Sequence, residues 1–273
     1  MSAGAGWCLA LGISLVFGFW RLVFAAMTDT VLLTLLIFAA ALLYSSVGHA
    51  GASGYLAVAA LFGLAPDTMK PTALVLNLVV AFVGTIRFAR AGFFVWHVFW
   101  PFALFSVPCA FLGGSWKLPD QTYKLFLGAV LMFAAWRLAI KPSTHAPAQQ
   151  KPIPIPLALA FGVPIGLLSG LVGVGGGIFL SPLLLLLGWA DPRKTAGVSA
   201  AFILVNSAAG LLGNLASQHP GAVLHEIVWW APAALIGGLI GAELGSRRLA
   251  PLVMRRLLAV VLVVAGAKLL LAR

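Results

Sequence analysis

Two glycine-rich interruptions in apolar sequence are the residues best suited to bind a ligand. The first runs from Ser46 to Gly54 (SVGHAGASG) and the second from Gly170 to Gly177 (GLVGVGGG), and a short apolar segment follows each. Glycine clusters sustain a helix poorly, so each run predicts a break between two helices. A helix that begins at a break directs its free amide groups and the positive end of its dipole toward it, which suits an anion.

The same glycines have a second interpretation, because glycine also lets two membrane helices pack closely. Close packing does not require a short apolar segment after each run, and such segments occur at residues 54–64 and 176–188. The preferred hypothesis is therefore an anion site at two half-helices. It places at the breaks His49, Gly51, Ser53 and Gly54 in the first run and Gly175, Gly176 and Gly177 in the second.

Polar side chains in the neighbouring apolar segments could complete this site. Hydroxyl and amide groups donate hydrogen bonds to an anion without trapping it by excess charge, although each could equally bond to a neighbouring helix. The candidates are Thr72, Asn77, Ser199 and Asn206, and the repeat described below predicts that Asn77 and Asn206 face one cavity.

Two basic side chains have two open interpretations each. Protonation of His49 would add positive charge beside the anion and make anion binding depend on pH, or His49 is a buried hydrogen-bonding group. Arg87 lies late in an apolar run, so it could reach the anion or anchor the helix at the membrane interface.

The composition places all these residues in a membrane. Of 273 residues, 62% are hydrophobic and 8% are charged, and the mean hydropathy is +1.08, whereas soluble domains carry charge at about a quarter of their positions. The chain has 17 Lys and Arg residues and 6 Asp and Glu residues. The basic residues gather at the ends of apolar runs, as in membrane proteins, which argues against a nucleic-acid partner. The two cysteines have no metal-binding spacing, so neither a metal nor a cofactor is expected.

The chain divides into two similar halves, residues 30–140 and 156–273. The offset that aligns them grows only from 125 positions, at Gly48 and Gly173, to 131 positions, at Pro101 and Pro232. Such a repeat is typical of transporters.

The segments outside the halves and the loop charges define the expected topology. Residues 1–29 predict an extra N-terminal helix, and residues 141–155 form a proline-rich linker. The loop that contains Arg87 and Arg90 is basic, whereas its counterpart at residues 217–226 has no Lys or Arg. Because basic loops collect in the cytoplasm, the halves are expected to be inverted, with a cytoplasmic linker.

The second break resembles a signature of one transporter family. The run Gly170–Pro182 (GLVGVGGGIFLSP), followed by Lys194–Ser199 (KTAGVS), resembles the TauE/SafE family of membrane permeases, and the first half carries a weaker copy at His49–Gly54 and Lys70–Asn77. The resemblance implies a cytoplasmic-membrane transporter of a bacterium or archaeon that carries sulfur-containing anions such as sulfite, sulfoacetate or other organosulfonates.

The sequence therefore predicts an all-α polytopic membrane protein of two inverted-topology repeats, whose broken, short helices meet at a central site. The predicted function is export of a small sulfur-containing anion by alternating access, without enzymatic activity. An importer of another small anion is one alternative, and an intramembrane serine protease that uses Ser53 is another, although no histidine base is evident on a later helix. The expected partners are the anion and the lipid bilayer, with a homodimer left open.

Overall fold

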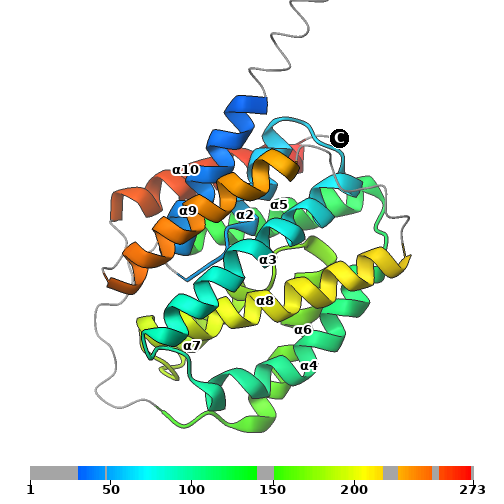
Figure 1. Ribbon diagram of the computed structural model, residues 1–273. Coiled ribbons are helices and arrows are strands. Elements are labelled where there is room, and N and C mark those ends of the chain that lie inside the picture. The colour runs from blue at the N-terminus through cyan, green and yellow to red at the C-terminus, as the bar shows by residue number, and fades with distance from the viewer. Residues whose placement is uncertain (1–29, 47, 140–150, 218–226, 248–251, 272–273) are drawn as a thin grey trace, which may run out of the picture.

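The computed structural model shows an all-helical bundle (Figure 1). The predicted extra helix at residues 1–29 lies outside the residues that the structure describes, as does most of the linker at 141–155. The described residues are 30–46, 48–139, 151–217, 227–247 and 252–271.

Helices account for most of the described chain in both halves. The first half contains a helix Thr30–Ser45, α2 Ala52–Leu61, α3 Pro66–Arg90, α4 Trp96–Ser115 and α5 Asp120–Ala139. The second half contains α6 Ile155–Val172, α7 Gly177–Leu186, α8 Pro192–Ser217, α9 Ile227–Arg247 and α10 Leu252–Leu271.

Helix length and composition confirm a polytopic membrane protein. Among the described residues, five helices are long and apolar enough to cross a membrane, namely α3, α4, α6, α8 and the Ile227–Gly245 part of α9. Large apolar side chains such as Leu104, Trp229 and Val264 lie exposed on the outside of the bundle, where lipid solvates them. The helices α2 and α7, at 10 residues each, are the two short segments that the sequence predicts.

The helices α6 and α7 form a hairpin that enters the bundle and returns. The backbone N–H of Lys151, before α6, donates to the carbonyl of Gly188, after α7, at 3.1 Å. The start and the end of this stretch therefore lie together. The helix Thr30–Ser45 and α2 form the matching hairpin, since a Cβ at Gly54 would lie 2.9 Å from the Cβ of Ala40.

Each hairpin packs on a long helix of the other half through a row of glycines. On α6 and on α9, a Cβ added at any glycine of the row would overlap the backbone of the facing helix, so the two backbones touch. The α6 row Gly162, Gly166 and Gly170 faces Phe102, Ser106 and Ala110 of α4. The α9 row Gly237, Gly241 and Gly245 faces Phe38, Leu42 and Ser46.

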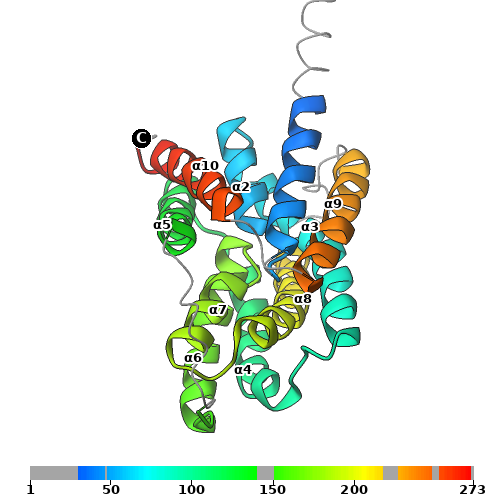
Figure 2. The ribbon, with the colours of Figure 1, turned by 90° about the vertical axis from the view of Figure 1, so that its left-hand side faces the viewer.

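Corresponding helices of the two halves run antiparallel where they meet. The helices α3 and α8 lie side by side through the centre (Figure 1), with Gly84 beside Ala200 at one end and Leu74 beside Gly210 at the other. The helices α5 and α10 also lie antiparallel to each other, at one side of the bundle (Figure 2). Inverted repeats produce this pattern, and the orientation of each half across the membrane stays a prediction.

Candidate functional site

The second break is built from glycines in a left-handed backbone conformation. Gly173, Gly175 and Gly176 have φ values of 85°, 79° and 78°, which L side chains rarely adopt. Space is as restrictive as conformation, because a Cβ at Gly175 would lie 2.9 Å from Asn77 Nδ2 and 2.8 Å from Ser207 Oγ. The glycine cluster therefore ends α6 and lets α3 and α8 approach the backbone closely.

The first break repeats this design with the halves exchanged. Gly48 and Gly51 have φ values of 77° and 103°. A Cβ at Gly48 would overlap Ala196 near the start of α8, whereas a Cβ at Gly173 would lie 3.2 Å from Lys70 Cγ near the start of α3. In each break, the first glycine with a left-handed backbone thus packs on a long helix of the opposite half.

Both short helices begin without a side-chain cap. Gly51 precedes α2 and Gly176 precedes α7, and neither position supplies a capping hydrogen bond from a side chain. The first four amide groups of an α-helix have no partner within the helix, and the dipole concentrates positive charge there. Each break therefore presents hydrogen-bond donors and partial positive charge inside the bundle.

The structure brings the two breaks together through a chain of polar side chains. His49 Nε2 lies 3.1 Å from Ser181 Oγ on α7, and Ser181 Oγ lies 2.8 Å from Ser199 Oγ on α8. A Cβ at Gly177 would lie 3.7 Å from the His49 ring. His49, Gly177 and Ser199, all expected at the site, are neighbours. Ser181 was missed, although it belongs to the glycine-rich motif and lies one turn into α7.

Asn77 reaches the second break from α3. Its Nδ2 donates to the Val174 carbonyl and to Ser207 Oγ, each at 3.3 Å, and its buried Oδ1 has no hydrogen-bond partner among the described residues. Asn206 does not join it, contrary to the expectation that both face one cavity. The hydroxyl of Ser106 on α4 donates to Asn206 Oδ1, and Asn206 Nδ2 donates to a carbonyl of its own helix.

Three further candidates lie on the first hairpin or against it. Ser53 and Gly54 form the first turn of α2 and are buried, and Gly54 packs against the preceding helix of its hairpin. Thr72 is buried on α3 and lines a cavity of about 10 Å³ beside α2, and its hydroxyl has no hydrogen-bond partner among the described residues.

Arg87 is engaged with α9. Its guanidinium lies 2.9 Å from a carboxylate oxygen of Glu243, and both side chains are partly exposed. The sequence also predicts a pair between Glu243 and Arg247, whose side chain lies outside the described part of the chain. Within the described residues, no three His, Cys, Asp or Glu side chains are grouped so that they could hold a metal ion.

Broken helical hairpins that meet inside a bundle of membrane helices are the architecture of secondary transporters. Comparison with known proteins identifies the family: the model described as sulfite exporter TauE/SafE matches residues 32–269. The chain therefore belongs to the TauE/SafE family of membrane transporters.

Similar proteins have the same general description. The chain is 41% identical over 246 residues to "Probable membrane transporter protein y4hK" of Sinorhizobium fredii, covering 89% of this chain and 99% of that relative. It is 36% identical over 85 residues to "Probable membrane transporter protein" of Xylella fastidiosa, 30% of each chain. It is 29% identical over 114 residues to "Probable membrane transporter protein YunE" of Bacillus subtilis, 42% of this chain and 40% of the relative. No solved structure matches the chain.

Proposed function

We propose that the chain exports small sulfur-containing anions, such as sulfite, sulfoacetate or another organosulfonate, across the cytoplasmic membrane of a bacterium or archaeon by alternating access. One observation carries this proposal. The helices that begin after Gly51 and Gly176 have no side-chain cap, and the contact between His49 and Ser181 joins the two breaks at which they begin. Membership in a family described as sulfite exporters supports the substrate class.

The groups at the breaks suit an oxyanion. The unpaired first-turn amides of α2 and α7 can donate hydrogen bonds to such an anion, as helix starts do in many proteins. The hydroxyls of Ser181 and Ser199 can turn to donate as well. Neutral donors hold an anion firmly enough to select it and loosely enough to release it, which transport requires. Protonation of His49 would strengthen binding by adding positive charge.

The packing of the two hairpins on different long helices supports alternating access. The hairpin of α6 and α7 packs on α4, and the hairpin that ends in α2 packs on α9, each through a row of glycines. Each break therefore belongs to a different group of packed helices, one with α4 and α6 and the other with α9 and α2. Rocking of one group against the other would expose the shared site first to one side of the membrane and then to the other.

Export is the direction that the membrane potential favours. Moving one negative charge out of a cell with a negative interior gains about 2.3 kcal/mol per 100 mV. A carboxylate proton relay is not needed for this, and Glu243, the acid within the α9 span, is paired with Arg87 at 2.9 Å.

Flux of radiolabelled sulfite from proteoliposomes tests this proposal. A potassium diffusion potential, negative inside, should accelerate efflux, and reversal of the potential should slow it. Flux that ignores the potential but follows a pH gradient would contradict uncoupled export, and accumulation against a negative interior would indicate an importer. Ser53→Ala is the control for a protease, since a protease would lose all turnover and a transporter should keep most of its flux.

A further inference from the structure

A small polar cavity adjoins the second break but is separate from the site described above. It has a volume of about 20 Å³ and lies between the start of α3, the end of α4 and the end of α8, with Lys70, Tyr123 and Asn214 in its wall. A cavity of this size holds about one water molecule. The Tyr123 hydroxyl donates to the Val172 carbonyl at 3.1 Å, and Gly173 packs on Lys70, so the cavity touches the backbone of the second break.

Lys70 places a positive charge in this wall. Among the side chains that the structure describes, it is the one charged group that is buried, at 5% exposure. Its ammonium group donates to the Gly114 carbonyl at 2.8 Å and, at 3.3 and 3.4 Å, to the carbonyls of Gly113 and Trp116. The two longer bonds are near the limit for a hydrogen bond, so an anion in the cavity could replace one of them.

Asn214 supplies a second donor that nothing in the described chain satisfies. Its side chain is 2% exposed, and its Nδ2 has no hydrogen-bond partner among the described residues. Buried amide donors are rarely left unpaired, because desolvation of the group is costly. An unpaired donor beside a buried ammonium, in the wall of a cavity, indicates a site for a negatively charged ligand.

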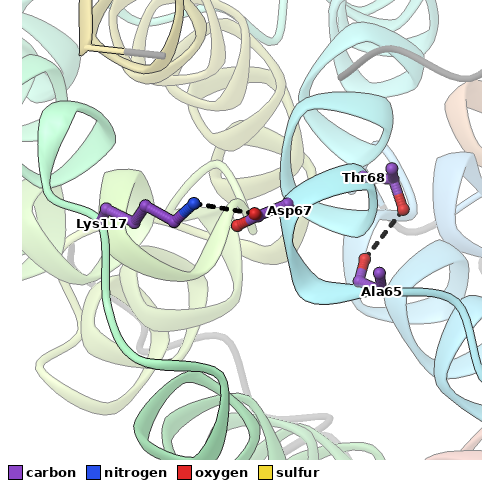
Figure 3. Close-up of polar contacts among 4 residues, drawn as sticks. All are labelled: Ala65, Asp67, Thr68 and Lys117. Carbon is purple, nitrogen blue, oxygen red and sulfur yellow. Dashed lines mark hydrogen bonds and ion pairs between the residues drawn. The ribbon is translucent and has the colours of Figure 1, made fainter. Parts of the chain in front are cut away.

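An ion pair covers the cavity. Lys117, in the loop after α4, lies 2.9 Å from Asp67 in the first turn of α3, and both line the cavity and are exposed (Figure 3). The carboxylate of Asp67 raises the pKa of Lys117, which therefore stays charged. Among the side chains that line the cavity, Lys70 and Lys117 exceed Asp67 by one positive charge, and the carboxylate of Asp120 also acts on Lys117. Exposed ion pairs contribute little to stability and open readily.

The cavity lies at the end of the bundle that is remote from the linker. The helices α4 and α6 run parallel, with Gly162 facing Phe102 and Gly170 facing Ala110, so the end of α4 is remote from the linker that precedes α6. At the opposite break, Ala196 occupies the place that Lys70 occupies here, against the first glycine. Only this end of the pseudo-symmetric pair therefore has a buried cation at this position.

We propose that this cavity is a second anion station, through which the transported anion passes between the second break and the end of the bundle remote from the linker. The Asp67–Lys117 pair closes the station, so that the closed cavity holds only about one water molecule and the anion enters when the pair opens. The inference rests on the proposed function, since the ligand is the transported oxyanion. With a cytoplasmic linker, the station lies on the outer side and receives the anion on its way out.

Sulfite flux in proteoliposomes tests the station with Asn214→Leu, which removes the donor and keeps the bulk. The KM for sulfite should rise about tenfold while the maximal rate stays within about twofold, and Asn214→Asp should raise the KM further because it adds a negative charge. Lys194→Gln is the control, because Lys194 lies in the first turn of α8, at the end of that helix opposite to Asn214, and pairs with Asp191. Its KM for sulfite should equal that of the wild type. An unchanged KM in both Asn214 variants, with normal wild-type flux, overturns the station alone. Absence of flux of sulfite, sulfoacetate and other organosulfonates in the wild type overturns the proposed function as well.

The closing pair has its own test. The double variant Asp67→Cys, Lys117→Cys, in a chain that also carries Cys8→Ser and Cys109→Ser, is linked with a short bismaleimide before sulfite is added. Linked protein should lose nearly all flux, while each single-cysteine variant treated alike should keep it. Full flux through the linked protein would contradict a passage at this place.

Discussion

Replacement of Gly175 by alanine separates a binding role of the second break from simple helix packing. At a φ of 79°, alanine is strained by about 1–2 kcal/mol. The new Cβ would also lie 2.8 to 2.9 Å from Ile203, Ser207 and Asn77, and such overpacking typically costs about 1–3 kcal/mol. Together, Gly175→Ala should lower the free energy of unfolding by about 2–5 kcal/mol.

Gly63 offers a matched control in the same chain. Its φ is 75°, but a Cβ there would meet nothing within 4 Å. Backbone strain alone should therefore lower the free energy of unfolding of Gly63→Ala, by about 1–2 kcal/mol. Denaturant titration in detergent micelles measures both losses, and the difference between the variants isolates the crowding at the second break.

Sulfite affinity decides between the two interpretations of the glycines. In Gly175→Ala, the new methyl group pushes Asn77 and the backbone of the break apart, so sulfite affinity in calorimetry should fall at least tenfold. Gly63→Ala should bind within about twofold of the wild type. If both variants fold and bind sulfite equally well, the glycines of the second break serve packing alone and the reasoning is refuted.

Four further results are expected. Asn77→Leu leaves a buried carbonyl at the second break without its donor and should destabilise the protein by about 1–3 kcal/mol in the same titration, with weaker sulfite binding; an unchanged affinity would remove Asn77 from the site. Gly166→Leu should prevent α6 from packing on α4, which a loss of the monodisperse peak in gel filtration would reveal, whereas a normal peak would contradict the close contact. Arg87→Gln should change stability by less than about 1 kcal/mol and flux by less than twofold, because its ion pair is partly exposed; a severe loss of flux would return Arg87 to the anion path. Single cysteines at positions 145 and 220, labelled from outside whole cells, should react only at 220, and the reverse pattern would invert the topology.

The breaks and the short helices could be predicted because their signals are local. Glycine clusters interrupt helices wherever they occur, and the predicted short segments at 54–64 and 176–188 are found as Ala52–Leu61 and Gly177–Leu186. The family could also be predicted, because its motif is contiguous in the second half. The match over residues 32–269 confirms it.

The partners of each helix could not be predicted, because they depend on packing between the halves. A row of small residues such as Gly237, Gly241 and Gly245 indicates a close contact but not which helix fills it. Asn206 was assigned to the shared cavity from the repeat alignment, yet Ser106 on a different helix binds it. In the sequence, Lys70 is notable only as the first residue of the weaker motif copy at Lys70–Asn77, and only the fold shows that it caps α4 from a buried position.

The most direct test of the central claim is to locate the bound anion. Selenite resembles sulfite in charge and shape, and selenium scatters anomalously, so crystals of the protein grown with selenite would mark the site. The proposed site at the two breaks predicts an anomalous peak within hydrogen-bonding distance of the first-turn amides of α7, near His49 and Ser181. A peak elsewhere, with the two breaks empty in a protein that transports sulfite, would contradict it.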